Sequence, residues 1–172
     1  MSTTQRTSRP TQGGFVSIEM IIIAIGVGLG LAAAAGMFSS SNANEEQRNI
    51  SVIAANARAL KTSSGYGSSG TNLIPSLIAI NGVPKNMSVS SGVVYNVYGG
   101  SVTVSSTGMG FSITTSKLPQ DACITLATKI AKNTFEQTKI NSGSAITGEV
   151  TTAAATQACS SDSNSITWTY SS

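Results

Sequence analysis

The chain has 172 residues, and only 10% of them are charged, against about 25% in typical soluble domains. This length suits one domain, and a hydrophobic content of 40% with a net charge of only +3 excludes a wholly disordered chain. The sequence has no histidine, which removes imidazole-dependent catalysis and most zinc sites.

Residues 1–14 are polar and basic, whereas residues 15–38 are almost entirely apolar. A helix over the apolar segment would be roughly 36 Å long, enough to cross a hydrocarbon core of about 30 Å. We therefore expect one membrane-spanning helix. Without Arg6 and Arg9 of the leader, eight basic side chains remain against seven acidic ones, so we expect no nucleic-acid partner.

Glu19 lies five residues into the apolar segment, and no cation is near it in the sequence. A carboxylate at the centre of a membrane span costs about 2.5 to 3.5 kcal/mol, and less near the end of the span. One interpretation places Glu19 at the membrane interface, where its carboxylate reaches headgroup water. The other interpretation is that a second chain supplies a cation.

Three glycines, Gly26, Gly28 and Gly30, form a G-x-G-x-G run in the apolar segment. No strand precedes the run, which excludes a dinucleotide-binding loop. With Ala32 and Gly36, these glycines form rows of small residues at a spacing of four, suited to close helix packing. Local unwinding is a second expectation for this segment, because each glycine weakens a helix by about 1 kcal/mol.

The next segment has one apolar face at helical spacing, formed by Ile50, Ile53, Ala54, Ala57 and Leu60. We expect one long helix over residues 15–62, with an amphipathic second half. Asn42 and Glu45 could instead form a capping box at a break in this helix. The Ser/Gly-rich residues 63–70 then predict a loop.

Residues 63–172 predict a globular domain that begins with a short helix within 72–80, capped by Asn72 and closed by Gly82. Residues 93–98, 101–105 and 110–115 then alternate with period two, which predicts an antiparallel meander. Its first turn is expected at Gly99–Gly100.

A helix over residues 121–133 is expected next, with Asp121 as its cap. Residues 135–140 and 165–170 are the remaining predicted strands. The order of elements, a long helix followed by mostly antiparallel strands, predicts an α+β fold.

Two cysteines, Cys123 and Cys159, are too few for a structural zinc site. In an exported protein such a pair predicts one disulfide, and two free buried thiols are the alternative. No spacing of residues suggests catalysis, so we expect no enzymatic activity, no metal and no cofactor. The pairs Glu45–Glu46 and Lys129–Lys132 are interpreted as solvated helix positions.

The run QGGFVSIE, between the basic leader and the apolar helix, resembles the amino terminus of type IV pilins. In that family a membrane-embedded aspartyl peptidase cuts after the glycine and methylates the new amino terminus. The resemblance implies cleavage between Gly14 and Phe15 and methylation of Phe15. It also implies that Glu19 meets the Phe15 amine of a neighbouring subunit in a filament, so that each buried charge gains a partner.

The run GFSITTSKLPQDACITLATKI and the 14-residue leader resemble the type IVb branch, especially toxin-coregulated and PilS-type conjugative thin-pilus subunits. Phe15 departs from this pattern, because phenylalanine at the first mature position is typical of the other branch. The resemblance implies a leader over residues 1–14, a long helix over 15–62 and a pilin domain over 63–172 with a Cys123–Cys159 disulfide. The residues expected to act in filament assembly are Phe15, Glu19, Gly26, Gly28 and Gly30.

The partners implied are other copies of the chain, a prepilin peptidase, an inner-membrane assembly platform with its ATPase, and an outer-membrane secretin. The subunit would wait in the inner membrane and then enter an extracellular pilus that serves cell contact such as conjugation, adhesion or aggregation. Two alternatives stay open: a pseudopilin of a type II secretion-like system, and a soluble secreted binding domain released by signal cleavage near Ala35.

Overall fold

The structure is a computed structural model that describes residues 41–131 and 134–171. Its first element is a helix over residues 41–59. The predicted apolar face of this helix is confirmed, because Ile50, Ile53, Ala54 and Ala57 are fully buried in the core. Residues 41–45 are helical, so the capping box at Asn42 does not interrupt the helix there.

Seven antiparallel strands form one sheet in the order β1-β2-β3-β4-β7-β5-β6. In that order the strands are Ser88–Ser90, Val93–Tyr95, Ser101–Ser106, Phe111–Leu118, Asn164–Tyr170, Gln137–Ile140 and Ile146–Thr147. Within the described residues, three further helices are α2 (Ile74–Ala79), α3 (Gln120–Ile130) and α4 (Thr152–Ala158). The predicted α+β class is therefore confirmed for the described part of the chain.

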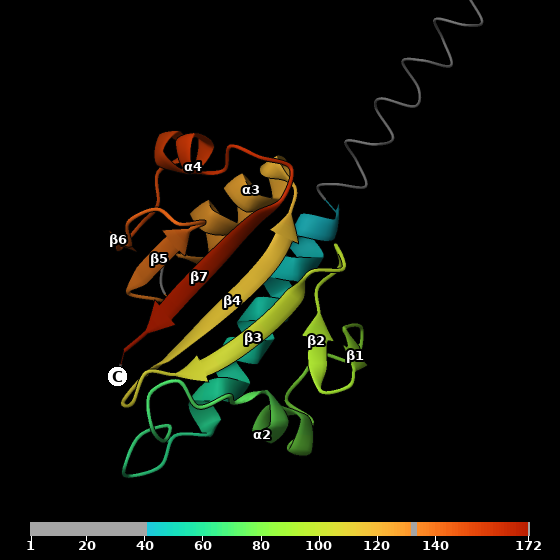
Figure 1. Ribbon diagram of the computed structural model, residues 1–172, viewed down its shortest axis with the longest axis vertical. Helices are drawn as coiled ribbons and strands as arrows, with labels where there is room; N and C mark the ends of the chain where they lie inside the picture. Colours follow the sequence, from blue (N-terminus) through green and yellow to red (C-terminus); the bar gives the residue numbers. More distant parts are fainter. Residues whose placement is uncertain (1–40, 132–133, 172) are drawn as a thin grey trace, which may run out of the picture. The chain divides into compact units, whose positions relative to one another are not determined.

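The sheet has one covered face and one face of hydroxyl side chains. Figure 1 shows the helix of residues 41–59 behind β3 and β4, and α3 behind β7. Side chains that point toward these helices are buried, such as the cross-strand pair Ile113 and Trp168. Their neighbours point the other way, and the Thr114 and Thr167 hydroxyls are hydrogen-bonded at 2.8 Å. This alternation explains why a sheet so rich in Ser and Thr still builds a core.

The predicted meander is confirmed, but its first strand is shorter than expected. Strand β2 ends at Tyr95, and residues 96–100 form a loop shaped by the Asn96 side chain. Its Oδ1 atom accepts from the Gly100 amide at 2.7 Å, while its Nδ2 atom donates to the Thr115 hydroxyl at 2.8 Å. The Asn96 side chain thus replaces the strand hydrogen bonds that the sequence pattern predicts for residues 96–98.

The predicted caps need correction. At the start of α2 the cap residue is Leu73 rather than Asn72, although the Ile74 amide donates to Asn72 Oδ1 at 3.0 Å. At its end, Asn81 rather than Gly82 takes the left-handed conformation, and the Gly82 amide donates to the Leu77 carbonyl at 2.7 Å.

The start of α3 also differs from the prediction. Its cap is Pro119, which has an extended backbone, and Asp121 lies in the first turn of the helix. Proline lacks the amide that a helix start leaves unpaired, so it fits this position without a side-chain cap. The Asp121 carboxylate is still placed near the positive end of the helix dipole.

The turn glycine Gly100 gives a stability prediction. A Cβ atom at this position would lie 1.9 Å from the Ser116 carbonyl oxygen, so β4 or the loop would have to move. We expect Gly100→Ala to lower the free energy of unfolding by about 2 to 3 kcal/mol, measured by urea denaturation of the full chain in detergent.

The matched control is Gly99→Ala, where no atom lies within 4 Å of the added Cβ but φ is +72°. Backbone strain alone should cost about 1 kcal/mol there. Equal losses from the two substitutions would contradict the assignment of the Gly100 effect to the contact with Ser116.

Candidate functional site

Most of the predicted site residues fall outside the described part of the chain. These residues are Gly14, Phe15, Glu19, Gly26, Gly28 and Gly30. Their roles in cleavage, methylation and assembly stay predictions. Within the described residues, no helix has the length and apolar character needed to cross a membrane.

The predicted disulfide is confirmed: Cys123 and Cys159 are bonded, with their Cα atoms 5.9 Å apart. Both cysteines are fully buried, and they connect α3 to the residue that ends α4. The closed loop contains β5, β6 and α4. The disulfide therefore links the segment that contains β5, β6 and α4 to α3, the helix that packs on the sheet.

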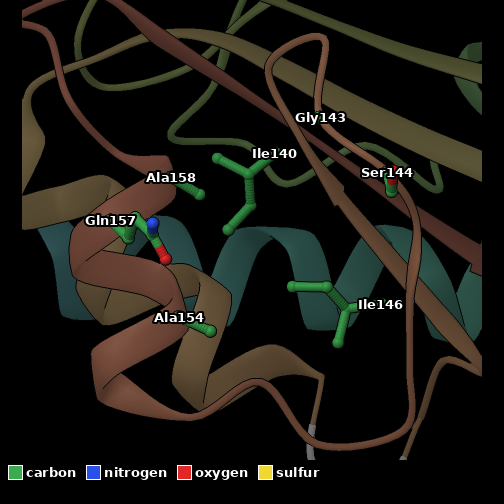
Figure 2. A pocket seen from close by; sticks show the side chains of 7 residues that line it. All are labelled: Ile140, Gly143, Ser144, Ile146, Ala154, Gln157 and Ala158. Atoms are coloured by element: carbon green, nitrogen blue, oxygen red, sulfur yellow. The ribbon is translucent and has the colours of Figure 1, made fainter.

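A hollow of about 220 Å³ lies between α4 and the β5–β6 hairpin. Figure 2 shows the side chains that line it. Its lining is mainly aliphatic, with Ile140, Ile146, Ala154 and Ala158, and Gln157 contributes a side-chain amide. None of the side chains that line it ionises at ordinary pH. This hollow therefore lacks the general acid or base that a hydrolytic or transfer reaction needs.

A second hollow, of about 330 Å³, lies between the end of α2 and the edge strand β1. Lys85 is the one ionisable side chain in its lining. Its lining includes two exposed aliphatic side chains, Ile78, which is 36% exposed, and Val89, which is 45% exposed. Among the residues that the structure describes, no three His, Cys, Asp or Glu side chains gather to bind a metal.

Glu46 overturns one prediction. The sequence places Glu45 and Glu46 at solvated positions, but Glu46 is 0% exposed in the structure. Its Oε2 atom accepts a long hydrogen bond of 3.4 Å from the Val97 amide, and its Oε1 atom has no partner. Desolvation by burial raises the pKa of Glu46 to about 7, although the Val97 amide and the Thr115 hydroxyl act in the opposite direction.

The other residues of the two charged pairs lie at the surface where the structure describes them. Glu45 is half-exposed and accepts from the Asn86 side chain at 2.7 Å. Lys129 is exposed and donates to Asn44 at 3.1 Å, while Lys132 lies outside the described residues. The sequence spacing could have identified Glu46 as a buried position, because Glu46 lies four residues before Ile50 and therefore on the same face of the helix.

Comparison with known proteins identifies the class. The fold is similar to that of a solved type IVb pilin from Salmonella typhi, with a TM-score of 0.64 and 26% sequence identity. The match covers 75% of this chain and 99% of that one. The fold is therefore that of a type IVb pilin.

The family follows from the sequence itself. The family model described as PilS N terminal matches residues 40–171. The chain belongs to this family, and the resemblance to type IVb pilins is confirmed. No curated protein sequence matched the chain.

Proposed function

We propose that the chain is the major structural subunit of a type IVb pilus, which polymerises through its amino-terminal helix into an extracellular filament. The observation that carries this proposal is the pilin fold joined, in sequence, to an apolar segment over residues 15–38. Residues 1–14 would be the leader, residues 15–62 the long helix and residues 63–172 the globular pilin domain. The activity of such a protein is assembly rather than catalysis.

Assembly begins when the leader is cut between Gly14 and Phe15 and the new amine of Phe15 is methylated. The amine then lies opposite Glu19 of a neighbouring subunit, and the two buried charges neutralise each other. Desolvation of both ions costs several kcal/mol per ion, so this pair fixes the register of the subunits more than it adds stability. Burial of the apolar side chains of residues 16–38 supplies cohesion on the order of tens of kcal/mol per subunit. Close contact between helices occurs along Gly26, Gly28 and Gly30.

Export is supported by the Cys123–Cys159 disulfide, because such bonds persist in oxidising compartments. The subunit resides in the inner membrane until an assembly platform and its ATPase extract it, and the filament leaves the cell through a secretin. The hydroxyl-rich face of the sheet makes the filament surface nearly neutral, which suits cell contact in conjugation, adhesion or aggregation. The exposed aliphatic side chains around α2 and β1 offer a further contact with neighbouring subunits.

The leader gives the experiment that tests this function. We expect Gly14→Trp to block the peptidase, so the full chain of 172 residues accumulates in the membrane and no filaments form. Immunoblotting of whole cells and of sheared surface material measures both effects. Gly13→Ala, one residue outside the cleaved bond, is the control and should be processed normally. Efficient processing of the Gly14 variant would overturn the assignment of a prepilin peptidase.

A further inference from the structure

A buried polar cluster joins the helix of residues 41–59 to the loop of residues 96–100. The helix contributes Glu46, the loop contributes Asn96 and Tyr98, and β4 contributes Thr115. Two of its buried polar atoms have no hydrogen-bond partner: Glu46 Oε1 and the Tyr98 hydroxyl. Buried polar atoms are normally paired, so this cluster is a weak point in an otherwise apolar contact.

The loop is hydrogen-bonded to the rest of the protein at its ends and to the helix at its middle. Asn96 holds the ends: its Nδ2 atom donates to the Thr115 hydroxyl and the Ser116 carbonyl of β4 at 2.8 and 2.7 Å, and its Oδ1 atom accepts from the Gly100 amide. Between them, the Val97 amide donates to Glu46 Oε2 at 3.4 Å. Glu46 is therefore the side chain that ties the centre of the loop to the helix.

The strength of this tie depends on the charge of Glu46. An ionised carboxylate in a buried site needs several good donors. Here the Val97 amide is distant, the Oε1 atom is unpaired, and the Thr115 hydroxyl favours the carboxylate less than burial disfavours it. A neutral carboxylic acid loses far less on leaving water, and its O–H group is an additional donor. The protonated side chain therefore fits the site better than the carboxylate.

The charged and titratable groups around Glu46 do not favour its ionised form. Glu45, on the same helix, disfavours a second negative charge. Tyr98 faces it from the loop with a phenol whose pKa is raised to about 12, mainly by burial, so the phenol is neutral at ordinary pH. From α3, Asp121 adds negative potential near Tyr98, and Lys129 is bonded to Asn44.

We propose that Glu46 is a protonation-dependent latch, which holds the loop of residues 96–100 against the helix as a neutral acid and releases the loop as a carboxylate. Burial gives the closed state a Glu46 pKa of about 7, whereas in the open, hydrated state the pKa returns toward 4.5. Opening is then least favourable below pH 4.5 and becomes easier as pH rises toward 7. Above about pH 7 Glu46 is ionised in both the closed and the open state, so the opening constant no longer changes with pH. This inference does not depend on filament assembly.

Amide hydrogen exchange of the full chain in detergent tests the latch. For the Val97 amide, which donates to Glu46, we expect the opening constant to rise about 70-fold between pH 5 and pH 8, after correction for intrinsic exchange rates. In Glu46→Gln the side chain cannot ionise, so the constant should not change with pH. Glu45→Gln is the matched control and should keep most of the wild-type increase.

Two results would overturn the proposal: an opening constant that does not vary with pH in the wild-type chain, or an equal increase in the Glu46→Gln variant. Should that variant fail to fold, carbon-13 NMR of the carboxyl groups in the unaltered chain answers the same question. The chain has five glutamates, and the Glu46 resonance should titrate near pH 7. A midpoint near 4.5 would also overturn the latch.

Discussion

Replacing Glu19 with Val is expected to abolish surface filaments while the subunit remains in the membrane at normal amounts. Valine suits the apolar segment, so insertion and leader cleavage should continue. In the filament, however, the Phe15 amine would be buried without a counter-charge, and an unpaired buried charge costs about 3 to 5 kcal/mol. Electron microscopy of cells, with immunoblots of sheared and membrane fractions, measures filaments and subunits separately.

Ile18→Val provides the control, because it alters the neighbouring position in the apolar segment and leaves the carboxylate in place. That variant should form filaments normally. Normal filament numbers in Glu19→Val would show that filament assembly does not require a charge pair between Glu19 and the Phe15 amine. Loss of the subunit itself from the membrane would mean that Glu19 acts at an earlier step.

Removing the disulfide is expected to cause the second large effect. Cys123 and Cys159 are separated by 36 positions, and closing a loop of that size stabilises a fold by about 3 to 4 kcal/mol. The double variant Cys123→Ala with Cys159→Ala should lose that amount of unfolding free energy. Because Trp168 is the one tryptophan and is fully buried, its fluorescence reports unfolding of the sheet in urea.

Reduction of the unaltered chain is the internal control for this measurement. A reductant should lower the stability of the wild-type chain to about that of the double variant and should not change the variant. A loss below about 1 kcal/mol in both cases would contradict the role of the bond as a main constraint on residues 123–159.

Regular patterns explain why parts of the fold could be predicted from the sequence. Ile50, Ile53 and Ala57 share one side of a helix, and alternation along residues 101–105 and 110–115 identifies paired strands. In both cases the hydrophobic period alone determines which side chains are buried. The cysteine pair was predictable for a similar reason, since an even number in an exported protein favours a bond.

Other elements carry too little local pattern to be predicted. Strands β1 and β6 have three and two residues, and α4 has one buried residue, Ala155. The position of β7 between β4 and β5 depends on contacts distant in sequence, such as Ile113 with Trp168. No short window of sequence specifies such a pairing.

Glu46 shows where residue type and position conflict. A glutamate is rarely buried, which favours a solvated interpretation, but the spacing of four from Ile50 places it on the apolar face. Tertiary packing determines the outcome, because the loop of residues 96–100 covers this position. Burial of Glu46 therefore costs free energy, and residues that break a local rule in this way are often found at functional sites.

Intact mass and amino-terminal sequencing of protein sheared from the cell surface test most directly whether the chain is cut after Gly14 and assembles through the apolar segment that follows. We predict a chain that begins with a methylated Phe15 and carries one disulfide. A chain that begins after the apolar segment, near Ala35, would contradict the account.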